Sequence, residues 1–124
     1  MKSDLLQGDG IICLKFAFEP TLDHKQVRGM SRVVEAAMDT TDDLRLLLDL
    51  RATRRFDPGA FLSGKSFLAS IKSIGPVTRY AVVGAPRLAS VAVEAFGKIL
   101  PLEARAFEAA DLAEAERWVM TPAV

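Results

Sequence analysis

The stretch that most constrains the fold is Leu44–Gly59, which reads LRLLLDLRATRRFDPG. Arg45 to Leu50 contains four leucines and is expected to be a buried strand. A charged turn follows, and Pro58 suits the first turn of a helix, which we expect to end near Ile74 before Gly75 and Pro76. A buried strand that leads directly into a helix indicates an α/β fold.

Further strands are predicted from their apolar patterns. Ile11–Phe18 and Arg79–Val83 are apolar runs, whereas Glu103–Phe107 alternates polar and apolar residues, as expected for a half-exposed edge strand. Gly8-Asp9-Gly10 is turn chemistry, and together with Asp4–Gln7 it predicts an antiparallel hairpin at the N-terminus.

Helices are predicted between these strands. Thr21 or Asp23 can cap the first, and Pro86 opens another that Pro101 ends. Apolar residues recur at helical spacing in the first helix (Val27, Met30, Val34, Ala37, Met38) and in the last (Leu112, Ala115, Trp118, Val119). We expect an α/β fold with one mostly parallel sheet of four to five strands and helices packed against it, in a single domain over residues 1–124.

Composition excludes several classes of function. Lys and Arg balance Asp and Glu at 16 each, so nothing predicts a nucleic-acid partner, and Arg54 and Arg55 alone are too few for a basic patch. No apolar run approaches the roughly 18 residues of a membrane span, so we expect no stable membrane insertion. The single cysteine, Cys13, fits a reducing compartment, and we expect a cytoplasmic protein. The single histidine, His24, excludes histidine triads and multi-histidine metal sites, and we predict no metal or other cofactor.

A match to a nucleotide-binding motif lies in Gly59–Ser66, GAFLSGKS, which satisfies the Walker A pattern G-x-x-x-x-G-K-[ST]. In a phosphate loop, Lys65 and backbone N–H groups would hold phosphates and Ser66 would bind magnesium. Eight residues separate this segment from the strand that ends at Leu50, however, and its apolar interior fits a helix better than a loop. A nucleotide-binding enzyme built on this motif is therefore the alternative function.

Charged residues gather after two predicted strands and form the candidate ligand-binding site. In open α/β sheets, ligands bind outside the carboxyl ends of the strands, where helix N-termini attract carboxylates or phosphates. The candidate residues are Arg51, Arg54, Arg55, Asp57 and Arg87. The alternative is a solvated loop whose arginines pair with surface acids. Asp49, for example, is predicted to accept backbone N–H groups of the following turn or to pair with Arg51.

Four short motifs carry a resemblance to a known family: Leu-Leu-Asp-Leu (47–50), Tyr-Ala-Val-Val-Gly (80–84), Glu-Ala-Arg-Ala-Phe (103–107) and Glu-Ala-Glu-Arg-Trp-Val (114–119). In order and spacing they resemble the SpoIIAA-like family, a group of small bacterial α/β proteins related to STAS domains. The resemblance implies a STAS-like sheet, no catalytic residues of settled identity, and binding of a protein partner or of a small apolar ligand. It is compatible with a homodimer. A small anionic ligand is suggested by the arginines of the candidate site.

The same resemblance implies that a regulatory switch is missing. STAS-type anti-sigma-factor antagonists carry Asp-Ser-Ser-Gly at the corresponding turn, with a phosphorylatable serine at the helix N-terminus. This chain has Asp57-Pro58-Gly59, which offers no hydroxyl group. We therefore expect a non-catalytic binding or regulatory module without that phosphorylation cycle.

Overall fold

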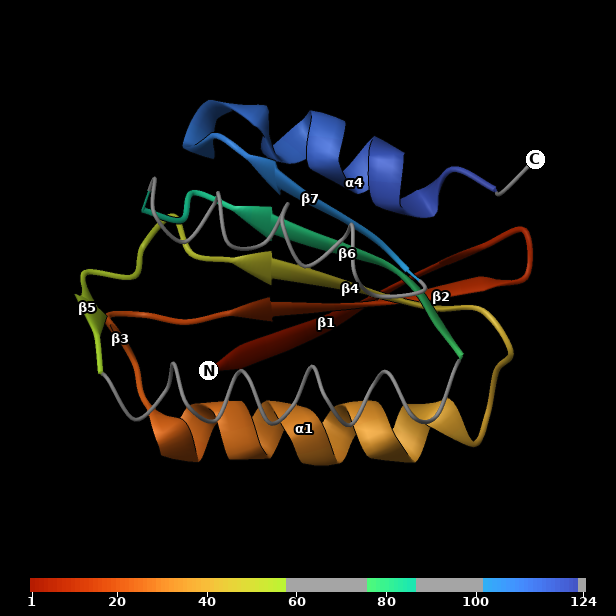
Figure 1. Cartoon of the computed structure of the whole chain (residues 1–124), viewed down its shortest axis with the longest axis horizontal. Coiled ribbons are helices and arrows are strands. Elements are labelled where there is room, and N and C mark those ends of the chain that lie inside the picture. Colours follow the sequence, from red (N-terminus) through yellow and green to blue (C-terminus); the bar gives the residue numbers. More distant parts are fainter. Residues whose placement is uncertain (58–75, 87–101, 123–124) are drawn as a thin grey trace.

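A five-stranded sheet forms the centre of the computed structural model, which describes residues 1–57, 76–86 and 102–122 (Figure 1). Its strands lie in the order β1-β2-β4-β6-β7, and all neighbours are parallel except β1 and β2. They are β1 (Lys2–Gly8), β2 (Ile11–Ala17), β4 (Leu44–Asp49), β6 (Val77–Val83) and β7 (Glu103–Phe107). The mostly parallel α/β sheet predicted from the sequence is confirmed.

The predicted N-terminal hairpin is present. β1 pairs antiparallel with β2 through a two-residue turn, because Gly8 lies opposite Ile11. The turn residues, Asp9 and Gly10, have φ angles of 54° and 77°, and this left-handed pair is the geometry that follows the twist of a hairpin. Gly10 adopts it without strain because it has no Cβ.

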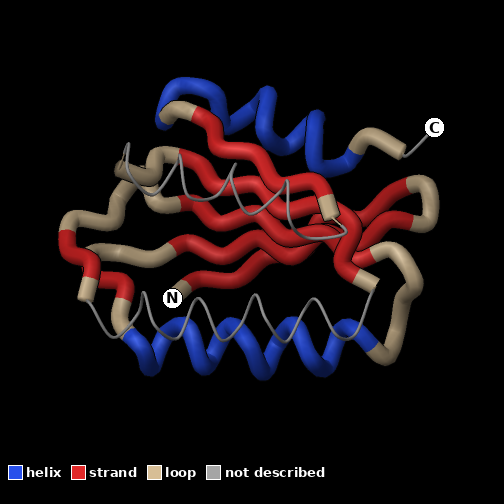
Figure 2. The backbone as a smooth tube through the Cα atoms, in the orientation of Figure 1, coloured by secondary structure: helices blue, strands red, loops and turns tan. Residues whose placement is uncertain are grey.

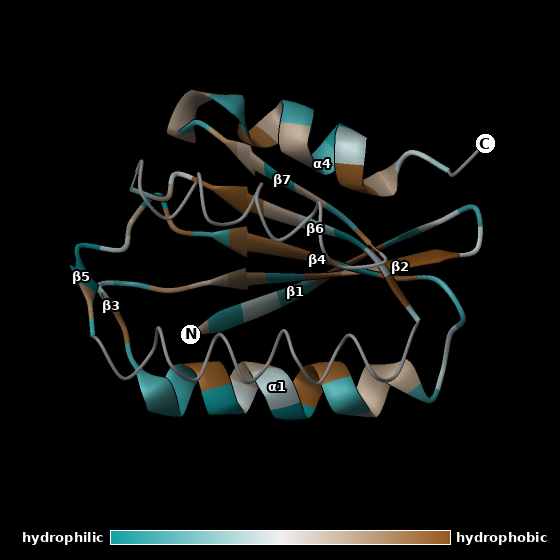
Figure 3. Cartoon of the chain, in the orientation of Figure 1, coloured by the Kyte–Doolittle hydropathy of each residue, from teal (hydrophilic) through white to brown (hydrophobic). Residues whose placement is uncertain are grey.

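Helices cover both faces of the sheet (Figure 1). α1 (His24–Met38) lies along one face and α4 (Leu112–Met120) along the other, where the short 3₁₀ turn η1 (Ala109–Asp111) precedes it. Successive residues of β4 alternate between these faces, so Leu46 and Leu48 pack in the core beneath α1 whereas Leu47 packs beneath α4. The two sides of the sheet therefore have separate apolar cores, and the apolar colouring of β4 and β6 in Figure 3 follows from burial on both faces.

The start of α1 is fixed by its cap. Asp23 accepts a hydrogen bond from the backbone N–H of Gln26, and the Gln26 side chain accepts one from the Asp23 backbone N–H. This reciprocal capping box satisfies two N–H groups that a helix start leaves without partners. Val27, Met30 and Val34 are buried against the sheet, which confirms the predicted helix and its apolar face.

A second, two-stranded sheet was not predicted. β3 (Thr21–Leu22) pairs parallel with β5 (Arg55–Phe56) beyond one edge of the main sheet (Figure 2). Thr21 therefore belongs to a strand, and Asp23 alone caps α1. The helices predicted after Pro58 and Pro86, together with the Walker A match, lie outside the described residues. Within the described part of the chain, no helix is long and apolar enough to cross a membrane.

Candidate functional site at the carboxyl edge of the sheet

The loop that follows β4 lies at the edge of the sheet where the parallel strands end. The N–H of Leu50 donates to the carbonyl of Val83 at the end of β6, at 2.8 Å. Gly84 follows with a φ of 76°, and a Cβ at this residue would lie only 3.0 Å from the Cα of Arg51. The loops after β4 and β6 thus touch at the carboxyl edge, as the sequence argument for a site required.

Arg51 is held by a neighbouring acid. Its Nε lies 2.9 Å from Asp49 Oδ1 and its Nη2 lies 2.8 Å from Oδ2, and the Asp49 carboxylate also accepts the backbone N–H of Arg51 at 3.1 Å. Burial alone would raise the pKa of Asp49, but the hydrogen bonds and the charge of Arg51 outweigh it and lower that pKa. The predicted partners of Asp49 are both present, and its carboxylate holds Nε and Nη2 of Arg51.

The backbone of the next segment, Arg54 to Asp57, is held in place by hydrogen bonds. The carbonyl of Pro20 accepts hydrogen bonds from the N–H groups of Arg54, at 2.7 Å, and Arg55, at 3.1 Å. The N–H of Asp57 donates to the carbonyl of Leu22 at 3.0 Å, which continues the pairing between β3 and β5. These three backbone hydrogen bonds fix the conformation of the loop without any contribution from its side chains.

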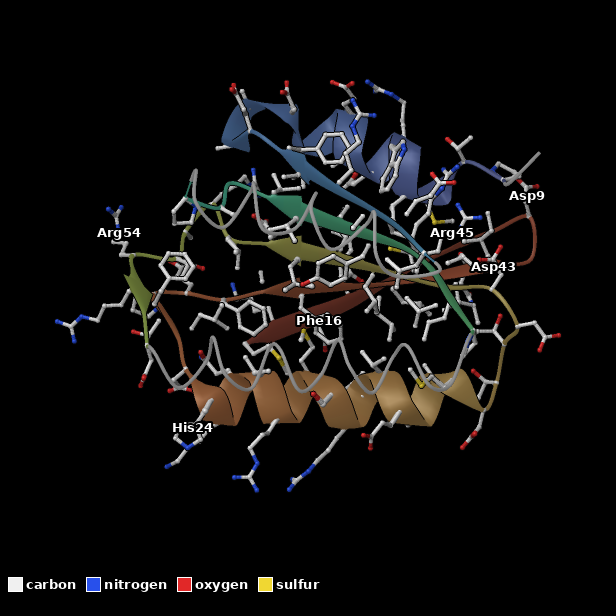
Figure 4. The ribbon with its side chains drawn as sticks, viewed as in Figure 1. Asp9, Phe16, His24, Asp43, Arg45 and Arg54 are labelled. Carbon is white, nitrogen blue, oxygen red and sulfur yellow. The ribbon has the colours of Figure 1, made fainter. Side chains whose placement is uncertain are left out.

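The side chains of this segment point into solvent. Arg54 and Arg55 are exposed and form no ion pair with any residue that the structure describes, and Figure 4 shows Arg54 extending away from the sheet. Phe56 beside them is 42 % exposed. We call Arg54–Phe56 the β5 tip.

Of the predicted site, the structure thus places Arg51, Arg54, Arg55 and Asp57 on one loop at the carboxyl edge. Arg51 pairs with Asp49 and is not part of the β5 tip. Asp57 is exposed at the far end of the loop. Arg87 lies outside the described residues, so a shared anion-binding rim stays a prediction.

Other reactive side chains show no catalytic arrangement where the structure describes them. Cys13 is fully buried beneath α4, and burial raises its thiol pKa to about 12, so little thiolate exists at neutral pH. His24 is exposed in the first turn of α1. Within residues 1–57, 76–86 and 102–122, no three His, Cys, Asp or Glu side chains come together in a way that could hold a metal ion.

A buried polar network beneath α4 was missed by the sequence reasoning. Arg45 is 0 % exposed although it lies in an apolar strand. Its Nε and Nη2 donate to the Asp43 carboxylate at 3.0 and 3.1 Å, and its Nη1 donates to the carbonyls of Val119 and Thr121 at the end of α4. Thr78 donates a further hydrogen bond to Asp43. Hydrogen bonds from Arg45 are the first cause of the lowered pKa of Asp43.

Arg79 extends this network on the neighbouring strand. Its Nη1 donates to the carbonyls of Trp118 and Thr121, its guanidinium lies 5.0 Å from the centre of the Trp118 ring, and Nε pairs with Glu103 at 3.4 Å. Arg45 thereby gives hydrogen-bond partners to the Val119 and Thr121 carbonyls at the end of α4, and Arg79 adds a second donor to the Trp118 carbonyl, which already accepts the N–H of Thr121. The spacing of Asp43 and Arg45, two residues apart and thus on one face of a strand, could have indicated the pair.

Comparison with known proteins assigns the fold to a family. The sequence profile of the SpoIIAA-like family matches residues 13–120. The chain belongs to the SpoIIAA-like family. No protein of curated function matches it significantly in sequence.

Solved structures agree with the assignment. An uncharacterised protein of the DUF3478 family from Shewanella loihica, described as having a SpoIIAA-like fold, superposes with a TM-score of 0.68 at 17 % identity, over 95 % of this chain and 92 % of the other. A putative anti-sigma factor antagonist from Thermotoga maritima superposes with a TM-score of 0.53 at 14 % identity, over 96 % and 95 % of the two chains. The superpositions show a shared fold at low sequence identity, and the SpoIIAA-like fold predicted from the sequence is confirmed.

Proposed function

We propose that this SpoIIAA-like protein is a binding module that catalyses no reaction and docks onto an acidic surface of a protein partner through the β5 tip. One observation carries the proposal: the backbone of the tip is fixed by hydrogen bonds to Pro20 and Leu22, while the side chains of Arg54, Arg55 and Phe56 are exposed. The fixed loop presents two cations that form no ion pair within the described residues, and an aromatic ring that is 42 % exposed.

The residue types of the β5 tip support protein recognition. Arginine and aromatic side chains are enriched at protein interfaces, where they account for much of the binding energy. A loop whose backbone is already ordered avoids part of the entropy cost of association. Two adjacent arginines favour an acidic partner, and their exposure predicts an association rate that falls as salt is added.

The proposal also explains how such a module could work without the serine switch. Asp57-Pro58-Gly59 has no hydroxyl group to phosphorylate. Binding would therefore be controlled by the concentration of the partner and by ionic strength rather than by phosphorylation of this turn. A location in the cytoplasm agrees with a free cysteine at residue 13. A small anionic ligand at the carboxyl edge remains the second candidate, because Arg87 could complete a rim with the β5 tip.

Charge reversal at the β5 tip tests the proposal against a matched control. The Arg54→Glu/Arg55→Glu variant changes the charge by four units, and so does Arg28→Glu/Arg32→Glu, which alters exposed residues of α1. Both variants and the parent are immobilised, and proteins retained from the cell extract are quantified by mass spectrometry. We expect a specific acidic protein to be lost from the β5-tip variant alone, and its binding to the purified parent to weaken with salt.

Equal retention by the parent and both variants would refute docking at the β5 tip. Equal loss from both variants would show that only net charge matters. Native mass spectrometry of the same purified parent checks the ligand alternative, since an anion retained by the parent and lost from the β5-tip variant would favour a small molecule.

A further inference from the structure

The outer edge of β1 is open for pairing. β1 is the first strand of the sheet, and no residue that the structure describes pairs with its outer side. All of its residues except Leu6 are exposed, and the side chain of Leu5 is among the most exposed large apolar groups of the described chain, at 47 %. An exposed edge of seven residues is a template for another strand. We propose that β1 pairs with β1 of a second copy of this chain.

The register of the hairpin determines which backbone groups of β1 point outward. The N–H of Ile12 in β2 donates to the carbonyl of Asp43, and the N–H of Phe18, directly after β2, donates to that of Asp49. The backbone groups of the even-numbered residues of β2 therefore point toward β4. Because both backbone groups of a residue point the same way, the residues of β1 opposite them turn away from β2. From the register of the hairpin, these outward residues are Ser3, Leu5 and Gln7.

A contact within β1 supports this orientation. The N–H of Leu5 donates to its neighbour's side chain, Asp4 Oδ1, at 2.8 Å. An N–H that is bonded to β2 could not do so, which agrees with an outward direction for Leu5. The Asp4 carboxylate therefore covers the central donor of the open edge and competes with any strand that would pair there.

The outward residues are arranged symmetrically about Leu5. If two copies pair antiparallel with Leu5 opposite Leu5, then Ser3 of each lies opposite Gln7 of the other, and the three pairs form six backbone hydrogen bonds. The two exposed Leu5 side chains meet on the α1 side of the sheet, and Asp4 lies opposite Leu6. If one β1 strand slides by two residues along the other in one direction, a hydrogen-bonded residue pair is lost. If it slides in the other direction, Asp4 lies opposite Asp4, and the two like charges repel.

This symmetry is the reason for choosing a second copy as the occupant. Every outward donor finds an acceptor in the same strand of the other molecule, and an exposed leucine finds its counterpart. The contact would join two five-stranded sheets into one. It uses residues other than the β5 tip, so it can succeed or fail independently of the proposed protein partner.

Sedimentation equilibrium over a range of concentrations up to about 1 mM, where weak dimers populate, tests the pairing. The parent should show a monomer–dimer equilibrium. Asp4→Ala removes the competing carboxylate from both copies and should lower the dissociation constant roughly a hundredfold, because each copy gives up one hydrogen bond to a charged group and each such bond corresponds to about tenfold. Asp42→Ala removes the same charge from an exposed loop and should leave the constant unchanged.

Proline substitution supplies the opposite perturbation. Leu5→Pro removes an N–H that donates only to the exposed side chain of Asp4 within the described chain, and proline is tolerated on the open side of an edge strand, so the monomer should fold while the dimer is lost. Ser3→Pro is the second variant should Leu5→Pro lower the melting temperature strongly. In the parent, hydrogen exchange at the Leu5 amide should slow as the concentration rises.

The proposal is overturned if the parent and Asp4→Ala both remain monomeric across this range. It is also overturned if the Leu5→Pro and Ser3→Pro variants dimerise with the same dissociation constant as the parent, because the two copies would then meet through another surface.

Discussion

Removing Arg45 should destabilise the fold by about 4 kcal/mol. Arg45 is fully buried, so Arg45→Ala loses charged hydrogen bonds to two carbonyls at the end of α4, worth about 1.5–3 kcal/mol each in other proteins. It also loses packing of the apolar stem at about 0.8 kcal/mol per methylene. Part of this loss is offset, because a buried guanidinium costs several kcal/mol to dehydrate. Asp43 is one-third exposed and can rehydrate, which keeps the total near the 3–5 kcal/mol typical of a broken buried pair.

Two further variants separate packing from hydrogen bonding. Arg45→Met keeps most of the stem and should cost about 2 kcal/mol, since only the polar contacts are lost. Arg105→Ala is the control, because Arg105 is also a strand arginine but is exposed over the ring of Phe107; it should cost about 1 kcal/mol or less.

Urea unfolding followed by circular dichroism and by tryptophan fluorescence measures these differences. The single tryptophan, Trp118, lies on α4 and reports whether that helix is docked. For Arg45→Ala we expect the melting temperature to fall by roughly 15 °C. A cost for Arg45→Ala no larger than that for Arg105→Ala would refute the view that Arg45 holds α4 on the sheet.

Three other outcomes follow from the structure. Gly84→Ala should destabilise by at least about 1 kcal/mol, because φ is positive and the new Cβ would press on the backbone of Arg51; thermal unfolding measures it, and a neutral result would contradict the close contact. Arginine partners lower the pKa values of Asp43 and Asp49, so their stabilisation is present at neutral pH and lost as the pH falls below about 4; urea midpoints that stay constant from about pH 5 to pH 2 would contradict this. Lys65→Ala should change stability by less than about 1 kcal/mol and abolish no nucleotide affinity, whereas magnesium-ATP binding by the parent that the variant lacks would establish the alternative enzyme.

The elements predicted correctly from the sequence are those in which burial alone determines the pattern of apolar residues. β4, β6 and α1 were found because burial on both faces, or on one helical face, leaves a regular period. Gly8-Asp9-Gly10 predicted the hairpin because left-handed turn residues leave few other choices.

The features that depend on distant partners could not be predicted. β3 and β5 have two residues each, and they form because the carbonyl of Pro20 and that of Leu22 meet a loop more than 30 positions away in the sequence. Arg45 was assigned to an apolar strand without a role, because its carbonyl partners belong to α4. At the candidate site, the pairing of Arg51 with Asp49 joins residues close in sequence and was predicted. The hydrogen bonds that fix the backbone of the β5 tip join residues far apart in sequence and were not predicted.

The central claim is that the β5 tip docks onto a protein. Site-specific photocrosslinking in cells tests it most directly, with p-benzoylphenylalanine in place of Phe56 and, as a control, in place of Val33, an exposed apolar residue of α1. We predict one discrete adduct from Phe56 that disappears when Arg54 and Arg55 are changed to glutamate, and none of the same mass from Val33. Absence of an adduct at Phe56, or identical adducts from both residues, would contradict the account.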